Sequence, residues 1–300
     1  MGIYKLSPDV ESFEWGGTKL KEYGKKAKNE TDKIAQTWEL CANGDHQSLL
    51  TTGKDAGITL GQYIKDTDGK AAGTIAKEFD YFPITIKMVD NQNVSAIQVN
   101  PDPEKVNLIY VLSAKEDAVF YCGLNEKIER EQMVEKIQNG TLQDLIRAFA
   151  VKAGDAFLIE PGTVFAIGDD IQYISIQQDS PLKEFSFEQV LDAITMDVAD
   201  VEKEAQQEVI EDGNAKTVML ANSDVFTTFK TELNGTVKID QDEDSFGSIV
   251  MIEGEAVINS DGGEIPASKG DTFFIDAGTK NIEIQGKGTY LYTFLSELDA

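Results

Sequence analysis

The sequence predicts a mostly β protein built from two small barrels, with helical segments between some of the strands. Residues 82–87 and 108–112 are short apolar or alternating runs bounded by turn signals, which is typical of strands. Residues 217–300 consist almost entirely of such runs and glycine turns, which favours a second sandwich or barrel. A chain of 300 residues is also long enough for two β-rich domains with separate hydrophobic cores.

Two stretches change from strand to helical spacing. Apolar residues recur at helical intervals across 125–150, where Gly140 predicts a helix end and Thr141 the N-cap of the next helix. A second helical stretch covers roughly 186–208, and Ser186 begins it with the spacing of a capping box. The predicted organisation is a first barrel from residues 1–124 and 151–185, a helical insertion at 125–150, a helical connector at 186–214, and a second barrel at 215–300.

A weak internal repeat supports duplicated barrels. Residues 151–159 are repeated in kind at 267–275, where a turn containing Gly-Asp leads into an apolar strand, and a Gly-Thr turn follows each copy. Gly-Asp is a common way to turn a corner, because glycine accepts positive φ and aspartate bonds the local backbone. Two copies followed by the same second turn favour duplication over coincidence. This rhythm is typical of the cupin, a small double-sheet β-barrel of the jelly-roll kind.

Composition and charge exclude several classes of function. Fifty-three acidic residues against 27 basic ones give a net charge of -26, which repels phosphate backbones, so no nucleic-acid partner is expected. No apolar run is long enough to cross a bilayer, so no membrane partner is expected either. The N-terminus has no apolar signal core. Cys41 and Cys122 lie far apart in sequence, so a reducing, cytoplasmic location is the simplest interpretation.

Several fragments, in order along the chain, resemble class I mannose-6-phosphate isomerases of the short bacterial type. Any one fragment is weak, but their order makes the resemblance specific, and it continues more loosely to residue 300. The fragments are Trp-Gly-Gly-Thr-Lys-Leu at 15–20, a tryptophan segment at 34–40, Phe-Pro-x-x-Ile-Lys at 82–87, Asn-Gly-Thr-Leu-x-Asp-Leu at 139–145, Val-Lys-x-Gly-Asp at 151–155, Gly-Thr-Val-x-Ala-Ile at 162–167, and Ile-Gln-Gln at 176–178.

The resemblance implies two cupin barrels and a zinc-dependent aldose–ketose isomerase, with zinc held in the first barrel by two His, a Gln and a Glu. Matched position by position, the Gln is kept as Gln98, whereas Asn100 and Phe165 stand where the family has His. Asn107 stands where the family has Glu. Amides are poor zinc ligands and a phenyl ring is none, so the substitutions predict no metal and no catalytic residue, and hence no cofactor.

The single histidine of the chain, His46, lies in a loop that is distant in sequence from these positions. One histidine cannot rebuild a site that needs two. A lone loop histidine is more often a solvated residue than a ligand, and the prediction here is the solvated one.

The pocket could still bind a ligand. Phe165 either repairs the vacated site as a core residue or offers a stacking surface to a ring, and the amides face hydroxyls or simply bind water. Lys87 and Lys105 keep family-matching places and could bind an anion. The family's arginine falls by count at Phe185, with Lys183 as the nearest base.

Three hypotheses of function remain from the sequence. The first is a pseudoenzyme, a mannose-6-phosphate isomerase homologue that binds a sugar or sugar phosphate without turnover. The second is an active mannose-6-phosphate isomerase with a relocated metal, and the third is a structural or interaction protein whose first barrel is packed shut. The replaced ligands count against the second, and an open polar cavity around Gln98, Asn100 and Asn107 would separate the first from the third. A homodimer is left open.

Overall fold

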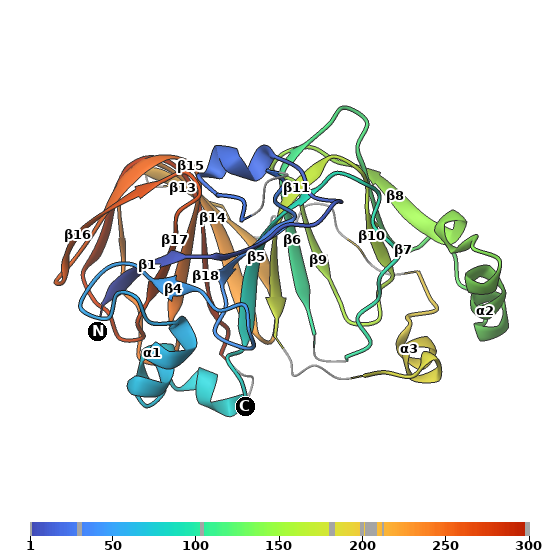
Figure 1. Ribbon diagram of the computed structural model, residues 1–300, viewed down its shortest axis with the longest axis horizontal. Coiled ribbons are helices and arrows are strands. Elements are labelled where there is room, and N and C mark those ends of the chain that lie inside the picture. Colours follow the sequence, from blue (N-terminus) through green and yellow to red (C-terminus); the bar gives the residue numbers. More distant parts are fainter. Residues whose placement is uncertain are drawn as a thin grey trace.

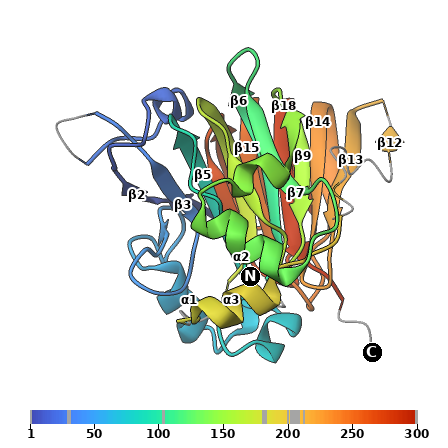
Figure 2. The same cartoon turned by 90° about the vertical axis from the view of Figure 1, so that its right-hand side faces the viewer.

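The computed structural model describes residues 2–28, 32–102, 105–179, 184–198, 201, 209–211 and 213–297. Two β-rich halves lie side by side along the long axis of the molecule, with helices at the far end of the first half and beneath the second (Figure 1). Strands dominate the described chain, which confirms the predicted class. The view along that axis shows α2 (Arg130–Gln138) and α3 (Phe187–Ala193) together in front of the first half (Figure 2).

The first barrel is made of a six-stranded and a three-stranded sheet. The six-stranded sheet has the order β2-β3-β5-β11-β6-β9, and the three-stranded sheet has the order β10-β7-β8. All of the pairings within these two sheets are antiparallel. The strands are β2 (Asp9–Glu11), β3 (Gln36–Leu40), β5 (Ile84–Asn91), β6 (Asn107–Ala114), β7 (Val119–Leu124), β8 (Ile146–Ala150), β9 (Ala156–Ile159), β10 (Phe165–Ile167) and β11 (Ile171–Gln178).

The second half is a nine-stranded antiparallel sheet with the order β12-β13-β14-β18-β15-β17-β1-β4, in which β16 also pairs with β15. Its long strands β14, β15 and β18 pair over most of their length. The strands are β1 (Ile3–Ser7), β4 (Leu49–Leu50), β12 (Val209–Glu211), β13 (Ala215–Asn222), β14 (Phe226–Ile239), β15 (Gly247–Ser260), β16 (Gly263–Ser268), β17 (Thr272–Ile275) and β18 (Ile282–Leu295).

The N-terminal strands differ from the predicted organisation, which assigned residues 1–124 to the first barrel. Strand β1 pairs with β17, with Ile3 opposite Ile275, and β4 extends the same sheet through β1. Strand β1 therefore belongs to the nine-stranded sheet of the second half, and the chain enters the six-stranded sheet of the first barrel at β2. Local sequence could not show this, because an apolar strand gives the same pattern whichever sheet buries it.

The helical insertion is shorter than predicted. Helix α2 ends before Gly140, whose φ of 67° gives the expected left-handed stop. Thr141 is the N-cap residue of the 3-10 helix η4 (Leu142–Leu145), as predicted, although its side chain makes no capping hydrogen bond. Residues 146–150, predicted within the insertion, form strand β8.

The connector begins as predicted. The Ser186 hydroxyl accepts a hydrogen bond from the backbone N–H of Gln189, and the Gln189 side-chain oxygen accepts one from the Ser186 N–H, which confirms the capping box. Helix α3 ends at Ala193, and residues 199, 200 and 202–208 of the predicted helical stretch lie outside the described residues. Helix α1 (Leu60–Asp66) and the 3-10 helices η1 (Lys19–Tyr23), η2 (Lys70–Ala72) and η3 (Ile75–Glu78) were not predicted.

The two copies of the internal repeat have the same local geometry. The Asp155 carboxylate accepts the Lys152 N–H at 2.9 Å, and the Asp271 carboxylate accepts the Ser268 N–H at 2.8 Å. The glycine before each aspartate has positive φ, 92° at 154 and 87° at 270. Each turn leads into the short strand that follows, β9 in one half and β17 in the other. The two halves therefore turn the same corner with the same bonds.

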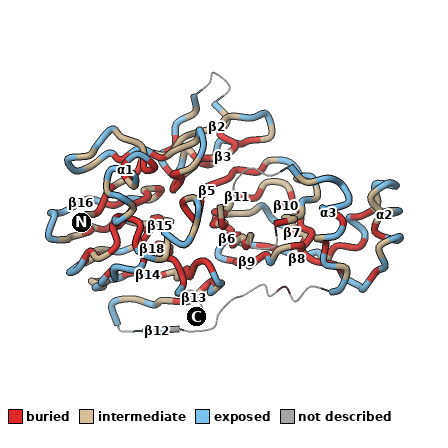
Figure 3. The backbone as a smooth tube through the Cα atoms, turned by 90° about the horizontal axis from the view of Figure 1, so that it is seen from below, coloured by how far each residue is buried: buried red, intermediate tan, exposed pale blue. Residues whose placement is uncertain are grey.

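Buried residues run through both halves and across the junction between them (Figure 3). The largest core cluster joins β5 and β11 of the first barrel to residues such as Phe226 and Phe274 of the nine-stranded sheet. A separate cluster fills the inside of the first barrel, where Phe120, Phe157 and Phe165 meet. Because strand residues alternate between faces, one face of β5 and β11 packs on the second half while the other lines the barrel interior. The candidate site lies on that interior face.

Candidate functional site

Two pockets that share Gln98 as a lining residue lie in the first barrel. The smaller one, here the amide pocket, has a volume of about 210 Å³. It is lined by Gln98, Val99, Asn100, Lys105, Asn107, Ile159, Phe165 and Gln177. The four positions that the resemblance matches to the family's metal ligands, together with Lys105, therefore lie around one cavity.

Gln98 and Phe165 are held together by their backbones. The Gln98 N–H donates to the Phe165 carbonyl at 2.8 Å, and the Phe165 N–H donates to the Gln98 carbonyl at 2.9 Å. This bridge ties the 92–106 connection to the short strand β10. The Phe165 ring is only 8% exposed and lies 6.4 Å from the Phe120 ring. Its body thus belongs to the barrel core while one side closes the amide pocket.

The two asparagines bind neighbouring protein groups. The Asn100 amide donates to the Lys105 carbonyl at 3.0 Å, and its oxygen accepts the Asp102 N–H at 3.3 Å. The Asn107 oxygen accepts the Ser175 hydroxyl at 2.8 Å. The side-chain oxygens of both asparagines therefore already accept hydrogen bonds, and the Phe165 ring offers no lone pair. These side chains do not fit the donor set that zinc requires, which is built from imidazole, thiolate or carboxylate.

Lys87 lies on the interior face of β5, opposite Trp38 on one side and Ser175 on the other. Its ammonium is 3.6 Å from the centre of the Trp38 ring. Burial and the neighbouring positive charge of Lys105 lower the pKa of Lys87 to about 8. Neither lysine ammonium forms an ion pair with a described residue. The barrel interior therefore holds two cations that the described part of the protein leaves without a paired carboxylate.

His46 is less solvated than the sequence predicted. Its ring stacks on the Trp38 indole at 4.8 Å with an interplanar angle of 7°, and its Nδ1 lies 2.7 Å from an Asp9 carboxylate oxygen. Its Nε2 lies 3.4 Å from Glu11, and the side chain is 38% exposed. Both ring nitrogens thus face carboxylates. Among the residues that the structure describes, no group of three or more His, Cys, Asp or Glu is arranged to hold a metal ion.

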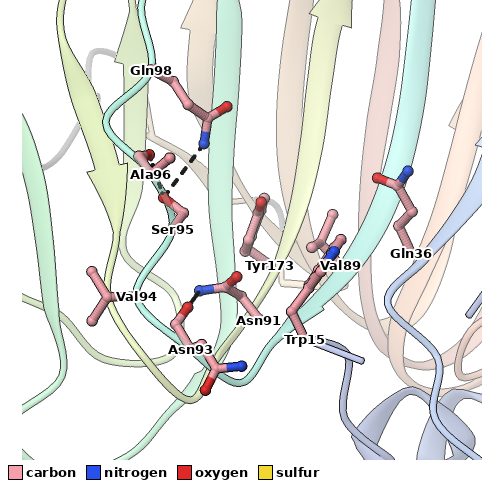
Figure 4. Close-up of a pocket in the computed structure, with 10 residues that line it drawn as sticks. All are labelled: Trp15, Gln36, Val89, Asn91, Asn93, Val94, Ser95, Ala96, Gln98 and Tyr173. Atoms are coloured by element: carbon pink, nitrogen blue, oxygen red, sulfur yellow. Dashed lines mark hydrogen bonds between the residues drawn. The ribbon is translucent and has the colours of Figure 1, made fainter. Parts of the chain in front are cut away.

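The larger pocket, here the neutral pocket, has a volume of about 370 Å³ and was missed by the sequence reasoning. Its lining comes from β3, β5, β11 and the segments around Trp15 and Ser95 (Figure 4). Strand alternation could have indicated part of it, because Asn91 lies four residues after Lys87 on the same face of β5. The lining residues are Trp15, Gln36, Val89, Asn91, Asn93, Val94, Ser95, Ala96, Gln98 and Tyr173.

Two residues proposed for ligand binding are not placed at the site. Phe185 is half-buried just before α3 and lines neither pocket, so its predicted role has no support in the geometry. Lys183 lies outside the described residues. No helix in the described ranges combines the length and apolar character needed to span a membrane.

Comparison with protein families and curated proteins gives consistent matches. A family model described as the cupin domain of mannose-6-phosphate isomerase matches residues 215–295. The chain is 26% identical over 311 residues to the mannose-6-phosphate isomerase ManA of Bacillus subtilis, covering 94% of this chain and 95% of that protein. It is 25% identical over 316 residues to the probable mannose-6-phosphate isomerase GmuF of the same organism, with the same two coverages.

Solved structures show the same fold. The crystal structure of the Bacillus subtilis mannose 6-phosphate isomerase matches with a TM-score of 0.87 at 22% identity, covering 98% of this chain and 99% of that one. A putative mannosephosphate isomerase from Archaeoglobus fulgidus matches with a TM-score of 0.77 at 17% identity, covering 98% of each chain. The two-barrel cupin fold predicted from the sequence is thereby confirmed.

Proposed function

The chain belongs to the cupin-type mannose-6-phosphate isomerase family, and from that premise we propose that it binds a sugar phosphate in its first barrel without isomerising it. In this proposal the protein is a pseudoenzyme that senses, stores or presents its ligand. The family fold supplies the cavity, and the side chains that line the cavity determine what it can do.

One observation carries the proposal. The four positions that would hold the metal surround a single pocket, and none of Gln98, Asn100, Asn107 and Phe165 has an ionisable side chain. A metal-assisted proton transfer between adjacent sugar carbons needs a Lewis acid bound firmly enough to polarise an oxygen. The amide oxygens of Asn100 and Asn107 are already hydrogen-bonded to protein. The pocket thus lacks the donors for metal catalysis but keeps polar walls.

The two lysines support an anionic ligand. Lys105 lines the amide pocket, and Lys87 lies close enough for the charge of Lys105 to lower the Lys87 pKa. In a protein with 53 acidic residues, two neighbouring ammonium groups without a described carboxylate partner leave positive charge available inside the barrel. A phosphate dianion would compensate both. An open cavity also counts against the alternative of a structural protein with a closed barrel.

Mannose 6-phosphate tests the proposal directly. Titration calorimetry of the purified chain should show saturable binding, and a coupled assay for fructose 6-phosphate, run with and without added zinc, should show no turnover. Lys105→Gln should weaken binding about tenfold or more, because it removes a charge-assisted contact to phosphate. Lys280→Gln makes the same change at an exposed site in the second half and should leave binding intact.

Turnover that depends on added metal would favour the alternative, an active isomerase with its metal held elsewhere. The absence of binding to any sugar phosphate would overturn the proposed function.

A further inference from the structure

The neutral pocket contrasts with the rest of the molecule in its charge. The protein carries a net charge of -26, yet none of the ten residues that line this pocket is Asp, Glu, Lys or Arg. The lining is made of amides, a hydroxyl, aromatic rings and small apolar side chains. A cavity of this kind does not favour a charged group over a neutral one. It does suit a molecule with many hydroxyls, because amides can both donate and accept.

Several polar atoms around the neutral pocket have no partner in the described structure. The Asn91 amide nitrogen donates to the carbonyls of Asn93 at 2.6 Å and Gly168 at 2.7 Å, which fixes the side chain and leaves its oxygen free to accept. The Tyr173 hydroxyl and the Gln98 side-chain oxygen make no hydrogen bond to a described residue. Figure 4 shows these three side chains arranged around one space. They form a set of preoriented hydrogen-bonding groups.

Aromatic surface completes the lining. Trp15 stacks on Phe13 with ring centroids 5.9 Å apart and an interplanar angle of 14°, so its orientation is supported from outside the pocket. Tyr173 contributes a second ring from β11. The carbon-bound hydrogens of a pyranose ring pack well on such surfaces, while the hydroxyls at the ring edge reach amides. Together the two features are typical of a site for a neutral sugar unit.

Size links this pocket to the amide pocket. Ligand sites for small molecules usually have volumes of roughly 300–1,000 Å³, and the amide pocket alone, at about 210 Å³, is below that range. The neutral pocket adds about 370 Å³, and Gln98 lines the wall of both. A ligand that fills both would have one anionic end near Lys105 and one neutral end near Trp15 and Tyr173.

We propose that the neutral pocket is a second sugar subsite, so that the ligand of this protein is a phosphorylated disaccharide whose neutral unit lies against Trp15, Asn91 and Tyr173. This inference rests on the proposed function, because the amide pocket is taken to hold the phosphorylated unit. It adds that a monosaccharide phosphate fills only part of the site.

The test compares affinities by titration calorimetry. The probes are mannose 6-phosphate, unphosphorylated β-1,4-mannobiose, and β-1,4-mannobiose carrying a phosphate on C6 of either unit. The wild-type chain should bind one of the two phosphorylated disaccharides about tenfold or more tightly than mannose 6-phosphate, since a second ring adds stacking and hydrogen bonds. Equal affinities for mannose 6-phosphate and both disaccharide phosphates would overturn the inference and leave the proposed function standing.

Two variants and one matched control locate the effect. Ala96→Trp fills the neutral pocket from an exposed position and should reduce the affinity for the preferred disaccharide phosphate to about that of mannose 6-phosphate, because the second ring no longer fits. Ala56→Trp, the same substitution in an exposed turn beside a different cavity, should keep the tenfold difference. Tyr173→Phe removes only the hydroxyl and should narrow the difference without abolishing it.

A difference that survives in Ala96→Trp would place the second ring elsewhere and overturn the inference. If no phosphorylated probe binds, the proposed function fails, and so does the inference of a second sugar subsite. Thermal melts of the variants, followed by circular dichroism, show whether each one is folded before its affinity is interpreted.

Discussion

The ammonium of Lys87 lies 3.6 Å from the centre of the Trp38 ring, and His46 stacks on the same indole. Trp38 therefore lies between the candidate site and the group formed by His46, Asp9 and Glu11. A cation over an indole gains electrostatic attraction from the ring, but less than a carboxylate would supply. The indole thus stabilises the largely buried ammonium of Lys87, which forms no ion pair with a described residue.

The protonation of Lys87 should control ligand affinity at alkaline pH. Its pKa is lowered to about 8, so the cation that attracts phosphate is present below pH 8 and is lost as pH rises through that value. The phosphate is already a dianion there, because its second pKa is about 6. Binding of mannose 6-phosphate, measured by calorimetry from pH 7 to 9.5, should weaken over this range in the wild type.

In Lys87→Gln the affinity should be lower at pH 7 and nearly independent of pH. In the wild type, the free energy of unfolding should change with pH in the opposite direction to the binding affinity. The unfolded chain keeps this proton up to about pH 10.5 while the folded chain releases it near 8, so this group raises stability as pH rises between those values. A binding curve that is flat in the wild type would contradict the role of Lys87.

Placing metal donors around the amide pocket should create a metal site. The triple variant Asn100→His, Asn107→Glu, Phe165→His supplies two imidazoles and a carboxylate beside Gln98 in the same pocket. After zinc incubation and desalting, elemental mass spectrometry should find about one zinc per chain in the variant and less than about a tenth in the wild type. Loss of the Asn100 and Asn107 hydrogen bonds should cost about 1 kcal/mol each in stability.

The single variant Asn107→Glu provides the control, because one added carboxylate should not retain zinc through desalting. Close to one firmly held zinc in the wild type would refute the claim that the donor set no longer fits a metal. The next step would then be to find the ligands among residues such as His46.

A buried ion pair at the junction of the two halves should be important for stability. Lys25 is 8% exposed and Glu39 is 0% exposed, and the Lys25 ammonium lies 2.7 Å from the carboxylate and 2.7 Å from the Gly270 carbonyl. The Thr272 hydroxyl donates to Glu39 at 2.8 Å. Either Lys25→Met or Glu39→Gln leaves one charge buried without its partner and should reduce the free energy of unfolding by about 3–5 kcal/mol.

Urea unfolding at pH 7 measures this effect. The double variant should lose less than the sum of the two single variants, since both singles break the same interaction. As a control, Lys238→Met breaks the exposed pair with Glu283 and should cost less than about 1 kcal/mol. Costs that simply add in the double variant would show that the pair does not act as a unit.

Asp276 should destabilise the protein as it ionises. Its carboxylate accepts the Tyr63 hydroxyl at 2.9 Å and the Gly2 N–H at 2.8 Å, but burial raises its pKa from 3.8 to about 6. The folded chain therefore binds more protons than the unfolded chain between these values, and this group lowers stability as pH rises from about 4 to 6. The shift corresponds to about 3 kcal/mol.

Asp276→Asn removes this titration. The difference in unfolding free energy between wild type and variant, measured from pH 3.5 to 7, should move in favour of the variant as pH rises and level off above 6. A difference that does not depend on pH would mean that Asp276 ionises normally in the folded protein.

Much of the fold was predictable because its signals are local. The Gly-Asp turns depend on one glycine with positive φ and one carboxylate that binds an N–H three residues earlier, and both copies adopt that geometry. The capping box at Ser186 is equally local. The prediction was wrong at strand β8, because helical spacing across 125–150 continued past the point where pairing with β7 made the chain extended.

The amino-acid sequence by itself determined which side chains stand at the positions that the resemblance matches to the family's metal ligands, and therefore what they can donate. The tertiary structure decided which other groups join them. Strand β1 entered the nine-stranded sheet, His46 reached Asp9, and the neutral pocket formed beside Gln98. Each of these contacts joins residues far apart in the chain, and it forms only when the sheets pack together and bury their shared faces. Periodicity shows that a strand has a buried face, but it does not show what lies against that face.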